Sequence, residues 1–274
     1  DAPFAHLHNH SQFSILQSTA STQDLVNAAI ADNQPAVAIT DTGNMMGAFH
    51  FTRAVNTHNA GLQKKYEEDL KAYEEFDDTA TPDSYRDDGV VPDKPEPPQE
   101  LKAIVGCEFF VCDDHTNKSQ KDNGYQIVLL AKNKKGYHNL AKMSSIAYTE
   151  GFYYVPRIDR EVIKKYKEDV MVLSGSMYGE VSSKILNIGE NQAEEALLWW
   201  KETFGEDFYL EIMRHDQEDE DRVNDTLIAF SKKHDVKLIA ANNTYYIDKE
   251  NANAHDILLC VKDGEKQATP IGRG

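Results

Sequence analysis

The chain has 274 residues, enough for one α/β barrel or two small domains, and its 40% hydrophobic content is ordinary for a folded protein. No apolar run approaches the roughly 20 residues of a membrane-spanning helix, and the opening DAPFAHLHNH lacks the basic and apolar regions of a secretion signal. We therefore expect a cytoplasmic protein with no membrane partner. The net charge of −17 argues against a domain that grips nucleic acid by itself, because DNA affinity comes largely from Lys and Arg contacts to phosphates.

Short apolar runs alternate with amphipathic stretches along the chain, a pattern typical of strands that are each followed by a helix. Strands are predicted at 4–8, 36–40, 102–111, 126–131, 169–175, 207–213 and 236–242. Helices are predicted at 21–33, 47–58, 136–149, 178–187, 191–204, 219–234 and 249–261. Ser21 and Asp24 offer a capping box for the first helix. Seven such units predict a largely parallel sheet or barrel.

Residues 59–100 interrupt this alternation. The stretch is acidic, poor in aliphatic residues and rich in proline toward its end. Its first part is predicted to be an exposed charged helix, and its second part a loop or disordered linker. We interpret it as an insertion within a single domain, residues 1–261. The tail, residues 262–274, has no core pattern and is expected to lead toward domains absent from this chain.

Histidines alternate near the start of the chain, at His6, His8 and His10. Alternate residues of a strand share one face, so the three imidazoles would project together. Imidazole is the commonest metal-binding side chain at neutral pH. The pattern favours a present or ancestral metal site at the carboxyl ends of barrel strands. The alternative is a set of buried histidines that only form hydrogen bonds.

The segment FAHLHNHSQFSILQ resembles the HxHxxxS opening of PHP (polymerase and histidinol phosphatase) domains, specifically those of bacterial DNA polymerase III α subunits. The similarity continues in order through AITDTGNMMGAFHF, IVGCEFFV, LLAKNKKGYHNLAKMSSIAYTEGFYYVPRIDRE, VLSGSMYGEV, FYLEIMRH and AANNTYYIDKENANAHDILLCV. This resemblance implies a distorted TIM-like (β/α)7 barrel. Active members of the family hold up to three metals with nine His, Asp, Glu or Cys ligands and hydrolyse phosphoesters.

The resemblance implies that nine positions of this chain correspond to those ligands. Only three of them keep a ligand residue: His8, His10 and Glu108. Neutral residues occupy the other six positions: Gln17, Thr42, Gln126, Ser176, Asn243 and Tyr245. Such side chains form hydrogen bonds but are poor ligands for zinc-like ions, and a cluster without balancing carboxylates is costly to fill. The resemblance therefore implies a largely degenerate site with no resident cofactor and no assigned catalytic residue. One divalent metal on the three retained ligands is the alternative.

The resemblance implies the N-terminal module of a replicative polymerase. Its expected partners are downstream polymerase domains of the same chain, which would hold Mg²⁺, and a separate proofreading exonuclease subunit. DNA and the sliding clamp would be reached through the full-length protein. One rival is an active metal-dependent PHP 3'-5' exonuclease or phosphoesterase, which the replaced ligands disfavour. Another is a free-standing enzyme similar to histidinol phosphatase, which the GFYYVPRID block and the unfinished tail disfavour.

Overall fold

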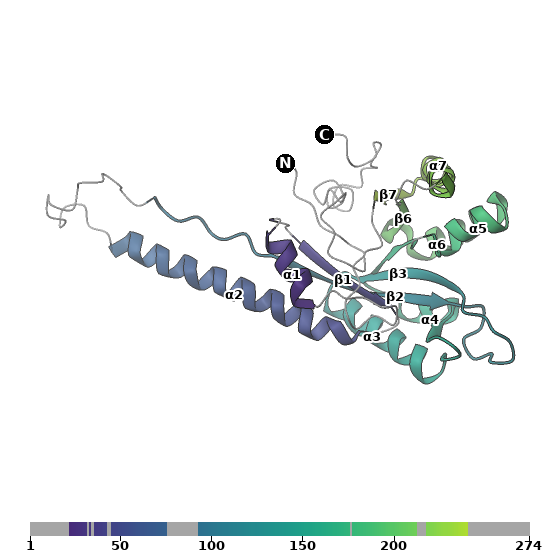
Figure 1. Cartoon of the computed structure of the whole chain (residues 1–274), viewed down its shortest axis with the longest axis horizontal. Helices are drawn as coiled ribbons and strands as arrows, with labels where there is room; N and C mark the ends of the chain where they lie inside the picture. Colours follow the sequence, from purple (N-terminus) through teal and green to yellow (C-terminus); the bar gives the residue numbers. More distant parts are fainter. Residues whose placement is uncertain are drawn as a thin grey trace.

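The computed structural model describes residues 22–31, 33, 36–42, 45–75, 93–175, 177–212 and 218–240 (Figure 1). The predicted strand at 4–8, the predicted helix at 249–261, the cap residue Ser21 and the tail lie outside these described residues.

Helices and strands follow one another much as the apolar pattern predicted. The strands are β1 (Ala36–Thr42), β2 (Lys102–Val111), β3 (Tyr125–Ala131), β4 (Arg157–Ile158), β5 (Val170–Leu173), β6 (Phe208–Ile212) and β7 (Lys237–Ala240). The helices are α1 (Thr22–Ala31), α2 (Met46–Glu75), α3 (Lys134–Thr149), α4 (Arg160–Tyr166), α5 (Glu180–Asn187), α6 (Glu190–Phe204) and α7 (Glu218–His234), with the 3-10 turn η2 (Gly205–Asp207) after α6. The sequence pattern missed β4 and α4, because both are too short to show a hydrophobic period.

The described strands form one curled sheet in the order β1-β2-β3-β5-β6-β7, and β4 pairs with β2 off this path. The predicted α/β barrel is thus present as a half-barrel of mixed strand direction. The expectation of a largely parallel sheet is wrong at β3, which runs antiparallel to both β2 and β5. The reason lies in the connection between β2 and β3, which is a loop at 112–124 without a helix. A chain that returns through such a loop pairs with the preceding strand in the opposite direction.

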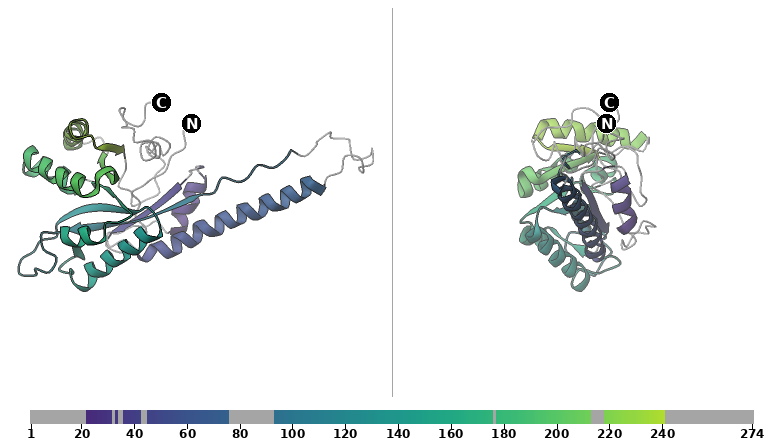
Figure 2. Two further views of the ribbon diagram at one scale, coloured as in Figure 1. Left: turned by 180° about the vertical axis from the view of Figure 1, so that it is seen from behind. Right: turned by 90° about the vertical axis from the view of Figure 1, so that its left-hand side faces the viewer.

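Helices cover the sheet on two sides and enclose two hydrophobic clusters. Figure 1 shows α3 and α4 below the β2–β3 pair and α5, α6 and α7 above it, and the reverse view in Figure 2 agrees. The larger cluster extends from Ala38 of β1 to β7 and includes the fully buried Trp200 and Met143. The smaller one packs Phe51 of α2 and Val26 of α1 against Ile39 of β1. Each such side chain stabilises the fold by about 1.5–3 kcal/mol relative to an exposed position.

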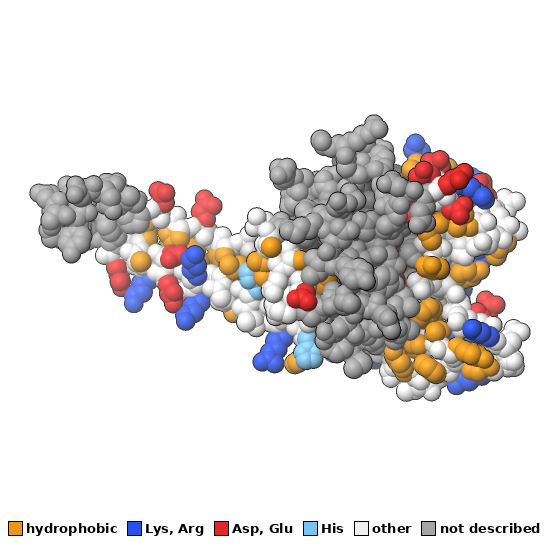
Figure 3. Space-filling view, in the orientation of Figure 1, with side chains coloured by type: hydrophobic (Ala, Val, Ile, Leu, Met, Phe, Trp, Pro, Cys, Tyr) orange, Lys and Arg blue, Asp and Glu red, His pale blue; other side chains and the backbone are white. Residues whose placement is uncertain are grey.

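Helix α2 continues past the body of the molecule as an arm (Figure 1). Residues 61–75 carry charged side chains of both signs, visible as red and blue groups along the arm in Figure 3. The ion pairs Lys64–Glu68 (3.8 Å) and Lys71–Glu75 (3.7 Å) bridge successive turns. The predicted exposed helix is therefore confirmed, but it is not separate from the preceding one: α2 is a single helix from Met46. None of the described helices is both long enough and apolar enough to cross a membrane.

The chain returns to the body along this arm. Residues 93–100 have no helix or strand, as predicted, and lead directly into β2. Pro95 and Pro98 are half-buried, whereas most of their neighbours are exposed. At the base of the arm, the Asn59 side-chain amide donates to the Leu101 carbonyl and accepts from its N–H, both at 2.8 Å. This pair of hydrogen bonds fixes the point at which β2 begins.

Candidate functional site

Three of the predicted site positions come together at one end of the sheet. In the parallel pair β1–β2, Thr42 is aligned with Glu108. In the antiparallel pair β2–β3, Glu108 lies opposite Val128, and Phe110 lies opposite Gln126. Paired residues share a face of the sheet, and so do alternate residues of one strand. The backbone therefore places positions 42, 108 and 126 on one face near the carboxyl ends of β1 and β2, where barrel sites are expected.

Two of these positions carry described side chains, and both are buried. Glu108 is 0% and Gln126 is 9% exposed. The Gln126 N–H donates to the Tyr178 carbonyl at 3.1 Å. Its buried side-chain oxygen Oε1 has no hydrogen-bond partner among the described residues. Gly175 approaches the same strand closely, because a Cβ there would lie 2.8 Å from the Gln126 carbonyl oxygen. Gly175, which precedes the predicted site residue Ser176 in the sequence, therefore lies close to Gln126.

Sequence reasoning missed one residue of this face, Glu211 in β6. Leu173 pairs with both Val128 and Tyr209, so Tyr209 and its alternate neighbour Glu211 lie on the face of Glu108. Glu211 is 1% exposed, and its N–H donates to Ser174 Oγ at 2.8 Å. The sequence signal that could have identified Glu211 is an acidic residue inside the otherwise apolar strand FYLEI. We call Thr42, Glu108, Gln126 and Glu211 the barrel mouth.

The described part of the barrel mouth offers two carboxylates and one neutral amide. An amide oxygen is a weaker ligand than imidazole for zinc-like ions, although it suits harder cations such as Mg²⁺ or Ca²⁺. These described donors alone could not balance a cluster of three ions, because several positive charges would face only two carboxylates. Of the remaining predicted site residues, the structure does not describe His8, His10, Gln17, Ser176, Asn243 and Tyr245.

A second polar cluster joins the 112–124 loop to α4. His115 Nδ1 lies 2.5 Å from Asp159 Oδ2, and its Nε2 lies 3.2 Å from Glu150 Oε2. The His115 backbone N–H also donates to Asp159 Oδ2 at 3.0 Å. The other Asp159 oxygen accepts from the Val162 N–H at 3.1 Å, so the same carboxylate caps α4. One buried aspartate thus ties the loop to the start of a helix.

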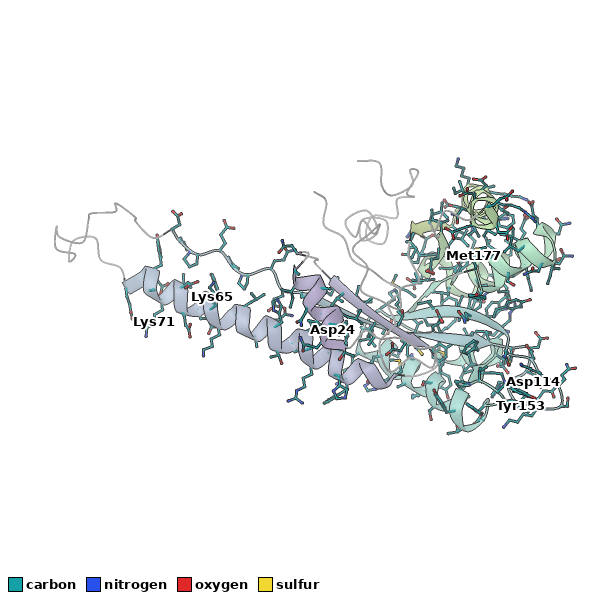
Figure 4. The ribbon with its side chains drawn as sticks, in the orientation of Figure 1. Asp24, Lys65, Lys71, Asp114, Tyr153 and Met177 are labelled. Carbon is teal, nitrogen blue, oxygen red and sulfur yellow. The ribbon has the colours of Figure 1, made fainter. Side chains whose placement is uncertain are left out.

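Arg157, which is fully buried, completes this cluster. Its guanidinium donates to four backbone carbonyls at 2.8–3.1 Å: those of Gly151, Asp122, His115 and Asn117. It also lies 5.6 Å from the centroid of the Tyr153 ring. Figure 4 labels Asp114 and Tyr153 at this corner of the molecule, far from Lys65 and Lys71 of the arm. We call His115, Glu150, Arg157 and Asp159 the loop clasp.

Charges within the loop clasp support one another. Burial by itself would lower the pKa of His115, but the hydrogen bonds to Asp159 and Glu150 outweigh it and raise the pKa above its ordinary value. For Asp159, burial would raise the pKa, but the hydrogen bonds from the His115 ring and from backbone N–H groups lower it. A protonated imidazole between two carboxylates is the arrangement that these shifts favour.

The same region contains a group with metal-binding geometry. Asp114, His115 and Asp159 each bring one ligand atom within 4.8 Å of the others, so they could hold an ion. Their side chains nevertheless already take part in hydrogen bonds without one. Both ring nitrogens of His115 meet carboxylates, and Asp114 Oδ1 accepts from the Thr116 N–H and hydroxyl at 2.9 and 2.7 Å. Sequence reasoning missed this cluster because its members are distant in the chain.

Comparison with known proteins gives consistent family and fold matches. A family model described as the PHP domain matches residues 6–215. The chain is 35% identical to DNA polymerase III subunit alpha of Borreliella burgdorferi, with 97% of this chain and 20% of that protein covered. The subunit of Campylobacter jejuni is 32% identical with the same coverage, and that of Thermus aquaticus is 32% identical over 94% of this chain and 18% of its own length. The chain thus spans about a fifth of these relatives.

Among solved structures, one described as a proposed metal-dependent phosphoesterase from Bifidobacterium adolescentis has a TM-score of 0.56. It is 13% identical and covers 95% of this chain and 97% of its own. An amidohydrolase from Chromobacterium violaceum has a TM-score of 0.50 at 10% identity, with 94% and 96% covered. At these identities the likeness concerns the fold alone.

Proposed function

Because the chain belongs to the PHP domain family, we propose that it is the N-terminal PHP module of a replicative DNA polymerase III α subunit. The observation that carries this proposal is the extent of the match to such subunits, which includes nearly the whole chain but a fifth of each relative. On this proposal, residues 1–261 form one domain, and residues 59–100 are an insertion within it. Residues 262–274 lead to downstream polymerase domains, and the protein acts in the cytoplasm.

The barrel mouth of this module is proposed to be a largely degenerate metal site. In its support, Glu108 remains, but Gln126 supplies a neutral amide where an active relative would supply an imidazole. The residue at position 42 is a threonine. Thr42 is aligned with Glu108, and Gln126 lies on the same face of the sheet. The module then holds no resident metal cluster, and a single divalent ion on His8, His10 and Glu108 is the alternative. The Mg²⁺ of polymerisation belongs to the downstream domains.

The role left to such a module is structural. We infer that it stabilises the downstream polymerase domains and docks the separate proofreading exonuclease subunit. Contacts with DNA and with the sliding clamp are then made through the full-length protein. The net charge of −17 supports a protein partner over a nucleic-acid partner for this module, because an acidic surface repels phosphates.

A second candidate function is an active metal-dependent phosphoesterase or 3'-5' exonuclease. One observation favours it: two buried carboxylates, Glu108 and Glu211, lie on the same face of the sheet. Carboxylates in a buried site are the groups that metal-dependent hydrolysis requires. The replaced ligands still weigh against this candidate.

Two measurements on the purified chain test these proposals. Hydrolysis of p-nitrophenyl phosphate and of a 3'-labelled single-stranded oligonucleotide is assayed with Mg²⁺, Mn²⁺ and Zn²⁺, with Glu108→Gln as the matched control. We expect no hydrolysis above the control, and a metal-dependent activity that Glu108→Gln abolishes would establish the second candidate instead.

Size-exclusion chromatography with the exonuclease subunit of the same organism tests docking. We expect one complex, and separate elution at micromolar concentrations would contradict the docking role.

A further inference from the structure

A cavity of about 410 Å³ lies at the other end of the sheet from the barrel mouth, where β2 begins and β3 ends. Thr52 of α2 and Tyr137 of α3 form parts of its wall. Its floor is apolar and comes from three strands, through Ile104, Leu130 and Met171. Ile104 and Met171 are only half-buried, although both pack against the main hydrophobic cluster. The volume falls in the range of about 300–1,000 Å³ that is common for ligand pockets.

Lysines surround this apolar floor. Lys102, Lys132 and Lys134 all line the cavity, all three are exposed, and no acidic residue lines it among the described residues. Lys132 is paired with Asp207 at 3.1 Å. For Lys102 and Lys134, by contrast, the described part of the chain provides no carboxylate within 4.0 Å. In a chain of net charge −17, this is a local reversal of sign. We call the cavity and its three lysines the basic groove.

We propose that the basic groove binds an acidic peptide segment of a partner protein, anchored by one or two large apolar side chains. The apolar floor would take the anchors, and Lys102 and Lys134 would pair with carboxylates on either side of them. Half-exposed aliphatic side chains gathered in a concave site mark places where a partner removes apolar surface from water. The two lysines supply the charge that selects an acidic segment over a neutral one. This inference goes beyond the proposed function and does not depend on it.

Nucleic acid fits the basic groove less well. Single strands need a cationic track along the backbone and aromatic rings for base stacking. The basic groove has an aliphatic floor with one tyrosine at its wall, and one of its three lysines is already paired. A short peptide with acidic and leucine residues fits better, because its carboxylates can pair with the lysines and its leucines can pack on the apolar floor.

The test is fluorescence anisotropy at low salt with a dye-labelled peptide in which glutamates flank two leucines, titrated with the intact chain. We expect saturable binding that weakens at least about tenfold in the double variant Lys102→Glu/Lys134→Glu, since two attractions become repulsions. The matched control is Lys65→Glu/Lys118→Glu, which reverses two exposed lysines on the arm and on the 112–124 loop and should leave binding unchanged. Met171→Glu should also weaken binding, with circular dichroism confirming that each variant is folded.

Several outcomes would overturn the proposal. Equal binding of a peptide with glutamines in place of the glutamates would remove the role of charge, and equal binding without the leucines would remove the role of the floor. An unchanged affinity in Lys102→Glu/Lys134→Glu would place the peptide elsewhere. Binding of laurate, without binding of the peptide, would make the basic groove a lipid site. A dimer seen by sedimentation that the same double variant abolishes would make its occupant a second copy of the chain.

Discussion

The loop clasp and the barrel mouth both bury polar side chains, but they do so in different ways. In the loop clasp, the described hydrogen bonds account for both His115 nitrogens, both Asp159 oxygens and four bonds from Arg157. At the barrel mouth, Gln126 has a buried oxygen without a partner in the described chain. A buried polar group that is fully bonded stabilises a fold, whereas one that is not bonded costs free energy. The buried Oε1 of Gln126 therefore has no evident structural purpose in the part of the fold that is described.

This difference separates two groups of buried polar residues that look alike in a sequence. His115 and Asp159 have metal-binding geometry, but their partners explain their burial without an ion. The Gln126 side chain has a buried oxygen without a described partner, and the family resemblance implies that positions 108 and 126 correspond to metal ligands. We interpret the loop clasp as a structural cluster, and the proposed function makes the barrel mouth the remnant of a metal site.

The largest expected effect is that of Arg157→Met on stability. The substitution removes the donor to the carbonyls of Gly151, Asp122, His115 and Asn117, and the bonds to Gly151 and His115 are buried. At about 1–3 kcal/mol for each buried acceptor left without a donor, we expect the free energy of unfolding to fall by about 2–6 kcal/mol. Urea denaturation measures it. The matched control, Arg160→Met, removes a partly exposed guanidinium paired with Glu180 and should cost only about 1 kcal/mol. Equal losses in the two variants would contradict the structural role of the loop clasp.

The second effect is a pH dependence that only the loop clasp should show. The raised pKa of His115 means that its contribution is fully present below the ordinary value of 6.5 and is lost as the pH rises through the folded-state pKa. The lowered pKa of Asp159 means that its contribution is present above the ordinary 3.8 and is lost as the pH falls through the folded-state value. His115 should therefore contribute most between these two limits, by about 1.5–3 kcal/mol for charged hydrogen bonds.

Denaturation of the wild type and of His115→Gln across this range measures that contribution. The difference in the free energy of unfolding should shrink as the pH rises above 6.5 and through the folded-state pKa of His115. His138→Gln, which changes an exposed histidine of α3, is the control and should show no such trend. A difference for His115→Gln that stays constant with pH would mean that the imidazole is not protonated between the two carboxylates.

The smallest effect is expected at the barrel mouth. Gln126→Leu removes a buried oxygen without a described partner, so the free energy of unfolding should change by about 1 kcal/mol or less. Asn139→Leu is a matched comparison, because both residues are 9% exposed and the Asn139 amide donates to the Glu168 carbonyl at 2.9 Å. Asn139→Leu should cost about 1–3 kcal/mol. If Gln126→Leu costs as much, the barrel mouth is a structural network like the loop clasp.

The sequence predicted what local patterns and family motifs determine. Long periodic stretches such as α3, α6 and α7 lie where they were predicted, and Glu108 and Gln126 share a face as the resemblance implied. The direction of β3 was missed because it depends on how the 112–124 loop folds. That loop is held by Arg157 and Asp159, which lie far along the chain, so no local period reveals it. Glu211 could have been predicted from the sequence, because it is an acidic residue within an apolar strand. The loop clasp could not, because its residues come together only in the folded structure.

On the proposed function, the barrel mouth has lost most of the ligands of a metal cluster. Elemental analysis of the purified chain, after growth with added zinc and manganese, measures how many ions remain bound. We predict fewer than two transition-metal ions per chain, with the same result for Glu108→Gln. Two or more ions per chain, lost on Glu108→Gln but kept in His115→Gln, would contradict the claim and show that the barrel mouth still holds a metal cluster.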